Sequence, residues 1–316
     1  MGQLGIIFLL LGVGLMVTGV IQVIIAYKMV PADTSFSALS DAMLASMNKP
    51  ENLNWLRLLQ VLSTLFMFFI PAVIYSWICN GKNIFWLGFN KYVNIYQILI
   101  GFLIIFTANV SAGPLQDLTE KIVAHFPSMD ALAKTLETKY NDQVIAISHI
   151  NGVADLLLVL VIMAFLPAMF EEVFFRAVLQ NLFVKWWKMP LLAIIFTSII
   201  FSFIHMSVYL FLSRAILGFA LGLMFHYTKN IWVNIIAHFL NNAIALIEMF
   251  ILNAQKKKVD VSNLDVKVDW WIGIVAIASL YGLFIFLKKY SENNKLKIFY
   301  KEQTLLVNEP SGNPLA

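Results

Sequence analysis

The sequence predicts an all-α protein, a polytopic transmembrane helix bundle of about eight spans with short amphipathic helices in its loops. Hydrophobic residues fill 60% of the 316 positions and charged residues only 13%, whereas soluble domains are roughly half apolar and a quarter charged. The apolar residues lie in long continuous runs, unlike the short alternating strands of a membrane barrel. This excess needs lipid as its solvent, so we expect an integral membrane protein in a lipid bilayer.

Eight apolar stretches approach the roughly 20 residues that a helix needs to cross a bilayer. They cover residues 4–27, 56–79, 92–112, 152–176, 190–206, 208–227, 231–252 and 270–287. The fifth stretch is short, and its junction with the sixth is tight. Together they predict one transmembrane domain over residues 1–290.

The remaining segments are more polar. Residues 28–55 and 113–148 mix charge with helical periodicity, which predicts short helices on the membrane surface. The tail, residues 291–316, ends in NEPSGNPLA, a composition typical of disorder. We therefore expect a disordered cytoplasmic tail.

The N-terminal stretch is interpreted as a retained span. It has no basic residue before its apolar run, and the run is longer than the apolar region of a signal peptide. The single cysteine, Cys79, cannot form an internal disulfide and is expected to be buried.

Lysines in the short loops predict the orientation, because basic residues favour the cytoplasmic side. With eight spans both termini share a side, together with Lys82, Lys91, Lys185, Lys188, Lys229, Lys288 and Lys289. Lys256, Lys257 and Lys258 are the contrary signal. We expect both termini in the cytoplasm, a bacterial inner membrane location, and no nucleic-acid partner, because the basic residues form no single stripe.

Charged residues interrupt the apolar stretch FLPAMFEEVFFRAVL, residues 165–179. Glu172 and Arg176 are four residues apart, so on a helix they share a face and can pair. Glu171 is rotated by about 100° from Glu172. Such groups are costly in hydrocarbon unless they face a bundle interior or a wet cavity.

Two later stretches carry further polar groups. FSFIHM places His205 at the end of the fifth span, and IIAHFLNNAIAL places His238 and Asn242 four residues apart on one face of the seventh. Each group alone has a structural interpretation, as an interface histidine or as an amide that joins helices. Their occurrence on three apolar helices together indicates a functional site.

Two kinds of chemistry fit these residues. A Glu beside a His can deprotonate a water molecule, and a second His with an Asn can stabilise the resulting oxyanion, which amounts to peptide or amide hydrolysis. Alternatively, Glu171, His205 and His238 are a ligand set that suits zinc. No HExxH motif is present, and the spacing does not decide between the two.

Three motifs stand in order on successive helices: EEVFFR matches EExxxR, FSFIH matches FxxxH, and HFLNN matches HxxxN. The trio resembles the CPBP family of intramembrane proteases, which includes the prenyl-protein (CAAX) endopeptidases and bacterial bacteriocin-processing and self-immunity proteins. The resemblance covers a protease-like core at about residues 150–250. It implies a peptide or protein substrate, membrane-associated or lipidated.

The resemblance also implies a role for each motif residue. Glu171 would activate water with the help of His205, while His238 and Asn242 would stabilise the oxyanion. Glu172 and Arg176 would position the others. The family is described both as metalloproteases and as metal-independent glutamate proteases, so a metal stays open.

A non-catalytic protein is the alternative: a transporter, or an immunity or scaffold protein that uses the same polar cavity for binding. Transporters often show internal repeats and broken helices, which are not evident here. Asp155 and His226 are expected at interfaces, Arg214 as a snorkelling or paired cation, and Glu248 as a further cavity candidate. One difficulty is depth, because the predicted spans place Glu171 and His205 at opposite ends of adjacent helices.

Overall fold

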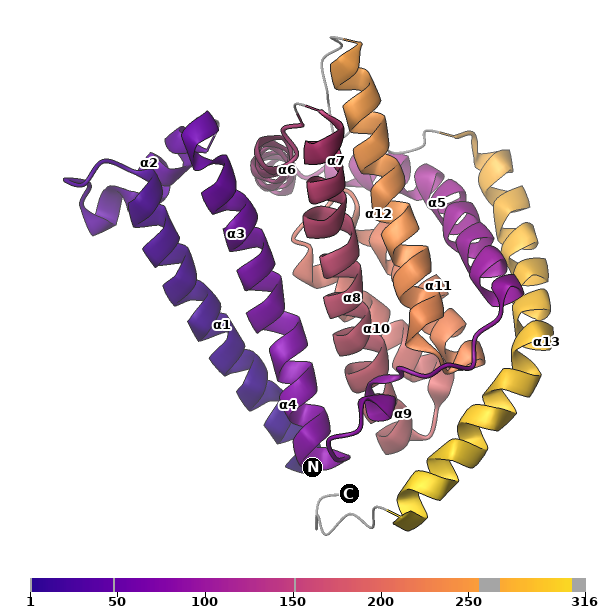
Figure 1. Cartoon of the computed structure of the whole chain (residues 1–316). Coiled ribbons are helices and arrows are strands. Elements are labelled where there is room, and N and C mark those ends of the chain that lie inside the picture. Colours follow the sequence, from indigo (N-terminus) through magenta and orange to yellow (C-terminus); the bar gives the residue numbers. More distant parts are fainter. Residues whose placement is uncertain (1, 48, 151, 256–267, 309–316) are drawn as a thin grey trace.

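The computed structural model describes residues 2–47, 49–150, 152–255 and 268–308, and the regular structure in them is helical (Figure 1). The long helices are α1 (Gly2–Met29), α3 (Leu53–Thr64) continued by η3 (Leu65–Phe69) and α4 (Ile70–Cys79), α5 (Ile95–Val123), α10 (Pro190–Ile204), α11 (Phe211–Thr228), α12 (Ile231–Ala254) and α13 (Trp270–Asn308). A further long helix comprises α7 (Val153–Val159), η5 (Leu160–Phe165), α8 (Leu166–Glu172), η6 (Val173–Gln180) and α9 (Asn181–Trp187). The predicted helical bundle is confirmed.

Seven of the described helices are long and apolar enough to cross a membrane. Each corresponds to one of the eight predicted stretches, and the remaining stretch, 190–206, forms the shorter helix α10 of 15 residues. The chain is therefore an integral membrane protein. The two loop segments that were expected to be helical contain η1 (Phe36–Ala38), α2 (Leu39–Ser46), η2 (Pro50–Asn52) and the longer α6 (Pro127–Ile147). A further short helix that was not predicted is η4 (Ile84–Leu87).

The helices form a bundle with two distinct edges (Figure 1). In that view α1 packs beside α3 and α4 at one edge, and α13 packs against α5 at the other. Between them lie the helix that runs from α7 to α9 and the helices α10, α11 and α12. The N-terminus and the C-terminal end of α13 lie at the same end of the bundle, and α6 lies across the opposite end.

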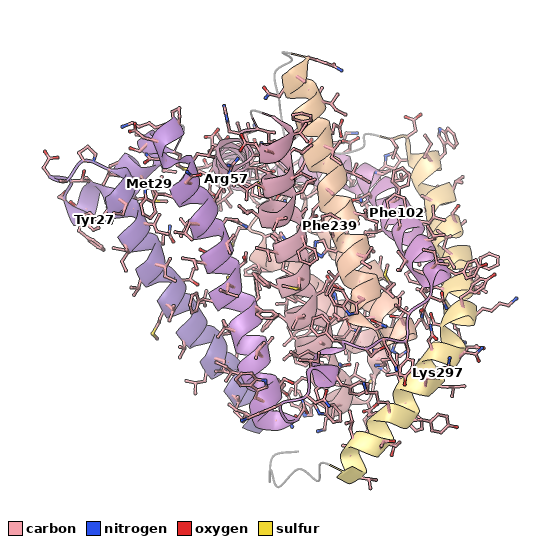
Figure 2. The ribbon with its side chains drawn as sticks, viewed as in Figure 1. Tyr27, Met29, Arg57, Phe102, Phe239 and Lys297 are labelled. Atoms are coloured by element: carbon pink, nitrogen blue, oxygen red, sulfur yellow. The ribbon has the colours of Figure 1, made fainter. Side chains whose placement is uncertain are left out.

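Helix α6 is attached to the N-terminal edge by a buried arginine. Arg57 of α3, labelled in Figure 2, donates to the carbonyl oxygens of Ile147 at 3.3 Å and His149 at 2.8 Å. Its guanidinium also lies 3.6 Å from the carboxylate of Asp155. The end of α6 and the start of α7 are thereby fixed against α3, and Asp155 has the structural role that was expected of it.

The prediction of a disordered tail over residues 291–316 is wrong for its first part, because α13 continues to Asn308. Polar contacts hold this extension against α5. Gln97 donates to Ser291 Oγ at 3.0 Å and accepts from Asn294 at 2.9 Å. These partners lie almost two hundred positions apart, so composition alone did not reveal them. Residues 309–316 lie outside the described residues.

Candidate active site

A cavity of about 350 Å³ lies among α6, η5, α8, α10, α11 and α12. Its lining includes Glu171, His205, His238 and Asn242, the four residues expected to be catalytic. Glu172 and Arg176 do not line it; both are completely buried behind Glu171. The fold therefore brings the four candidates to one hollow and places the two supporting residues in the protein interior.

The expected mismatch in depth disappears because the predicted span 152–176 was too short. The helix continues to Trp187, so Glu171 lies near its middle. At about 1.5 Å per residue, roughly 24 Å of helix separates Glu171 from Trp187. Helix α10 then runs back from Pro190, and roughly 22 Å of helix brings it to His205. Two antiparallel paths of similar length thus bring the two side chains to one depth.

The helix that carries Glu171 and Glu172 is not uniform. The segments η5 and η6 on either side of α8 are π-helical, a geometry that is frequent at functional sites. The continuation beyond residue 176 is stabilised by a buried amide, because Gln180 donates to the Gly222 carbonyl oxygen at 3.0 Å. Gly222 permits this approach, since a Cβ atom there would lie 2.6 Å from the Ile194 side chain.

Glu172 is the centre of a buried polar cluster. Its Oε2 accepts from Arg176 Nε at 3.1 Å, which confirms the predicted pair four residues apart. The same oxygen accepts from Asn234 Nδ2 at 3.0 Å. Its Oε1 lies 3.1 Å from His238 Nδ1. Three donors from two helices surround one carboxylate, which compensates the cost of burying it.

Asn234 was missed by the sequence analysis. It is fully buried and also donates to the Leu221 carbonyl oxygen at 2.8 Å, so it joins α12 to α11. A signal for it exists in the sequence, because Asn234 stands four residues before His238 and therefore on the same helix face. An isolated amide in an apolar helix was not distinctive enough to single it out.

The contact with Glu172 determines how His238 presents its ring. An ionised carboxylate only accepts hydrogen bonds, so Nδ1 carries a proton. The other ring nitrogen, Nε2, lies 3.9 Å from Glu171 Oε2, too far for a direct hydrogen bond. The His238 ring thus lies between two carboxylates: it is hydrogen-bonded to the buried Glu172 and is close to Glu171, which lines the cavity.

His205 is oriented by the residue one turn before it. Its Nδ1 lies 2.7 Å from the Phe201 carbonyl oxygen, which can only accept, so Nδ1 is the protonated nitrogen. Nε2 of the neutral ring is then an acceptor. The Phe201 ring lies 4.6 Å from the His205 ring and 5.3 Å from the Arg176 guanidinium, centre to centre. The FxxxH spacing therefore places an aromatic ring between the buried cluster and the cavity.

Asn242 belongs to a row of amides on the far side of the cavity. Its Oδ1 accepts from Asn241 Nδ2 at 3.4 Å, and Asn241 in turn is hydrogen-bonded to Asn109 of α5. Among the described residues, the Asn242 Nδ2 group donates to no partner. This amide group is therefore available to a ligand in the cavity.

The described residues form no assembled metal-binding set. Among the described residues, no three His, Cys, Asp or Glu side chains are grouped so that they could hold a metal ion. Glu171, His205 and His238 are therefore not grouped as a zinc ligand set in this structure. The contact of His238 Nδ1 with Glu172 leaves Nε2, on the side of Glu171, as the ring nitrogen that is open to a ligand.

Helix α6 closes the end of the cavity with Tyr140, Gln143, Val144 and Ile147. It is attached to the loop between α10 and α11 by two hydrogen bonds, from Ser207 to Glu137 at 2.8 Å and from Tyr209 to Asp130 at 2.7 Å. Lys134 and Tyr209 lower the pKa of Asp130, while burial and Asp130 raise the pKa of Tyr209 to about 12. Tyr209 is consequently a stable donor to Asp130 at neutral pH.

The other polar candidates lie in different places. Glu248 is exposed and lines a neighbouring cavity, and His226 lies in the last turn of α11. Arg214 was expected to snorkel or to pair with a carboxylate, but it forms no ion pair with any described residue. It donates instead to the His205 carbonyl oxygen at 3.3 Å and lies 5.0 Å from the Tyr140 ring centre.

Comparison with known proteins supports the motif-based resemblance. Residues 153–244 match the family model described as Type II CAAX prenyl endopeptidase Rce1-like. The match extends from α7 into α12, less than a third of the chain, and contains all six motif residues. No curated protein and no solved structure matched the chain. The resemblance to an intramembrane protease family is thus confirmed for this segment, and it supports protease activity with a peptide substrate at the level of the family.

Proposed function

We propose that the protein is an intramembrane endopeptidase in which Glu171 activates a water molecule and His238 and Asn242 stabilise the oxyanion. One observation carries the proposal: Glu171, His205, His238 and Asn242 reach one cavity from three helices. Polar groups are costly within a membrane unless they face the bundle interior or a wet cavity, and there they commonly mark functional sites. Their convergence on a hollow is expected for chemistry on a bound molecule.

The first step is attack on the peptide carbonyl. A water molecule between Glu171 and His205 Nε2 donates its protons to these two acceptors. As its oxygen bonds to the carbonyl carbon, one proton passes to Glu171. The carbonyl oxygen becomes negatively charged. His205 orients the water without changing its own proton count.

The second step is collapse of the tetrahedral intermediate. Asn242 Nδ2 donates to the oxyanion, and His238 Nε2 donates as well when the ring carries both protons, a charge that Glu172 compensates. Glu171 then returns the proton to the leaving amine nitrogen, and the carbon–nitrogen bond breaks. Arg176 and Asn234 keep Glu172 in place and so orient His238.

The substrate we propose is a peptide or protein that is membrane-associated, with a lipidated chain as one candidate. The lysine distribution supports cytoplasmic termini, and we propose a bacterial inner membrane as the location. The protease-like core at about residues 150–250 would work within a single transmembrane domain, residues 1–290.

Replacement of the proposed base tests the function. We expect Glu171→Gln to lower cleavage at least 100-fold, because a general base contributes roughly 10²–10⁴-fold. Comparing protein N-termini in cells with the wild-type protein or with Glu171→Gln should reveal termini that depend on Glu171. Glu292→Gln, an exposed carboxylate on α13, is the matched control and should leave those termini unchanged.

The opposite outcome is equally informative. Identical sets of N-termini in wild type and Glu171→Gln would remove the proposed base. A cellular phenotype that survives both Glu171→Gln and His238→Ala would favour a non-catalytic role in binding.

A further inference from the structure

A second cavity of about 290 Å³ adjoins the proposed active site, on the side of α5 where Phe102 is labelled in Figure 2. The two cavities share a wall, formed by Ile105, Tyr140, Arg214, Leu217, Asn241 and Ala245. Arg214 is the only Lys or Arg among the described residues that line either cavity. Its guanidinium thus lies where a molecule in the active site would extend into the neighbouring space.

The three arginines of the chain differ in their partners. Arg176 has Glu172 at 3.1 Å and Arg57 has Asp155 at 3.6 Å. Arg214 has no such carboxylate among the described residues. One of its N–H groups donates to the His205 carbonyl oxygen, and its Cζ lies 5.0 Å from the Tyr140 ring centre. The remaining N–H groups of the guanidinium fork are free to bind a ligand.

Local structure adds to the positive potential at this point. Arg214 lies at the start of α11, where the unpaired N–H groups and the helix dipole already favour negative charge. The first turn of α11 contains no acidic residue. A cation near a helix N-terminus is unfavourable by itself. An anion beside Arg214 would compensate both the guanidinium charge and the positive end of the helix dipole.

Nearby carboxylates do not neutralise Arg214 directly. Glu137 and Glu248 line the second cavity and Glu171 lines the first, but none forms an ion pair with it. Glu137 is hydrogen-bonded to Ser207 instead. The competing interpretation is that Arg214 only supplies a compensating charge for Glu171, and the test must separate the two.

We propose that Arg214 binds a carboxylate of the peptide substrate, either the C-terminal carboxylate or an acidic side chain, and thereby determines which peptide bond reaches Glu171. The inference rests on the proposed endopeptidase function. A guanidinium matches a carboxylate with two parallel hydrogen bonds, so it fixes position as well as charge. The Tyr140 ring and the His205 carbonyl oxygen both contact the guanidinium and restrict where it can lie.

The test uses the full-length protein in detergent and four synthetic ten-residue peptide libraries. The libraries have free or amidated C-termini, each with or without Asp and Glu. For Arg214→Gln we expect a 10- to 100-fold loss of kcat/KM, mainly through KM, on the library form that supplies the bound carboxylate, since hydrogen bonds to charged groups are worth about 1.5–3 kcal/mol. The amidated library without acidic residues should be cleaved equally by both proteins. Arg214→Lys should recover part of the loss.

The pattern of loss across the four libraries identifies the source of the carboxylate. A loss confined to free C-termini assigns the terminal carboxylate, and a loss confined to libraries with Asp and Glu assigns a side chain. An equal loss on all four libraries, with an unchanged melting temperature, would overturn the inference and leave the endopeptidase in place. Absence of cleavage by the wild type, indistinguishable from Glu171→Gln, would overturn the proposed function and this inference with it.

Discussion

The N-terminal edge of the bundle and the helices around Glu172 are held together by different kinds of contact. Along most of their length α1 and α3–α4 meet through apolar contacts and a close backbone approach at Gly14, where a Cβ atom would collide with the Phe66 carbonyl oxygen. Around Glu172, charged and amide groups from α8, η6 and α12 bind one another. The first region shows that this protein can join helices without charge. The charges in the second region therefore indicate work other than adhesion.

The largest effect should come from breaking the buried cluster. Arg176→Leu leaves Glu172 sealed without its guanidinium, and we expect a loss of about 3–5 kcal/mol, because an unpaired buried charge is strongly destabilising. Thermal unfolding in detergent measures it. The double variant Glu172→Met with Arg176→Leu removes the pair altogether and should recover much of the stability without recovering cleavage. A single variant as stable as wild type would contradict this account of the cluster.

A smaller effect is expected at the N-terminal edge. Gly14→Ala forces α1 away from Phe66, and overpacking of this kind costs about 1–3 kcal/mol. Gly12→Ala is the matched control, since no atom lies within 4 Å of a Cβ built there. We expect Gly14→Ala to lower the unfolding temperature while the folded protein cleaves at the wild-type rate. A fall in cleavage by folded Gly14→Ala would show instead that the two regions are coupled.

The smallest effect concerns α6, which bridges the two regions. The pKa of Asp130 is lowered in the folded protein, chiefly by its hydrogen bond to Lys134 and then by Tyr209. Its contribution to stability is therefore present above its ordinary pKa and is lost as the pH falls through the lowered value. The protection of α6 amides, which is the intrinsic exchange rate relative to the measured rate at the same pH, should stay constant between pH 7 and 5. It should fall below about pH 4, where Asp130 begins to take up a proton.

Tyr209→Phe supplies the control for the α6 prediction. It should make α6 exchange slightly faster already at pH 7, because the hydrogen bond to Asp130 is absent. A loss of wild-type α6 protection that begins well above pH 5 would point to another titrating group.

The sequence predicted the bundle because hydropathy reports directly which segments enter lipid. It did not predict the helix ends that depend on contacts between residues far apart in the sequence. Gln180 donates to the Gly222 carbonyl oxygen, and Gln97 donates to Ser291 Oγ. Both contacts stabilise a helix beyond the end that hydropathy predicted for it. Hydropathy windows contain no information about such partners.

For the candidate site, too, the sequence predicted contacts within one helix but not contacts between helices. Spacing on one helix was sufficient to predict the pair of Glu172 and Arg176, since residues four apart share a helix face and can pair. Asn234 and Arg214 acquire their meaning only from contacts between helices and from the cavity walls. The roles of Glu171, His205, His238 and Asn242 remain predictions, for which their common cavity is support.

The shortness of α10 has a consequence for the surrounding bilayer. Its 15 residues extend roughly 22 Å, whereas the hydrocarbon layer is about 30 Å thick. Lipids that border this helix must compress, or their headgroups and water must follow the chain inward. The boundary between water and hydrocarbon is thereby displaced towards His205. The distance from the membrane surface to the depth of His205 is shorter here than beside the longer helices.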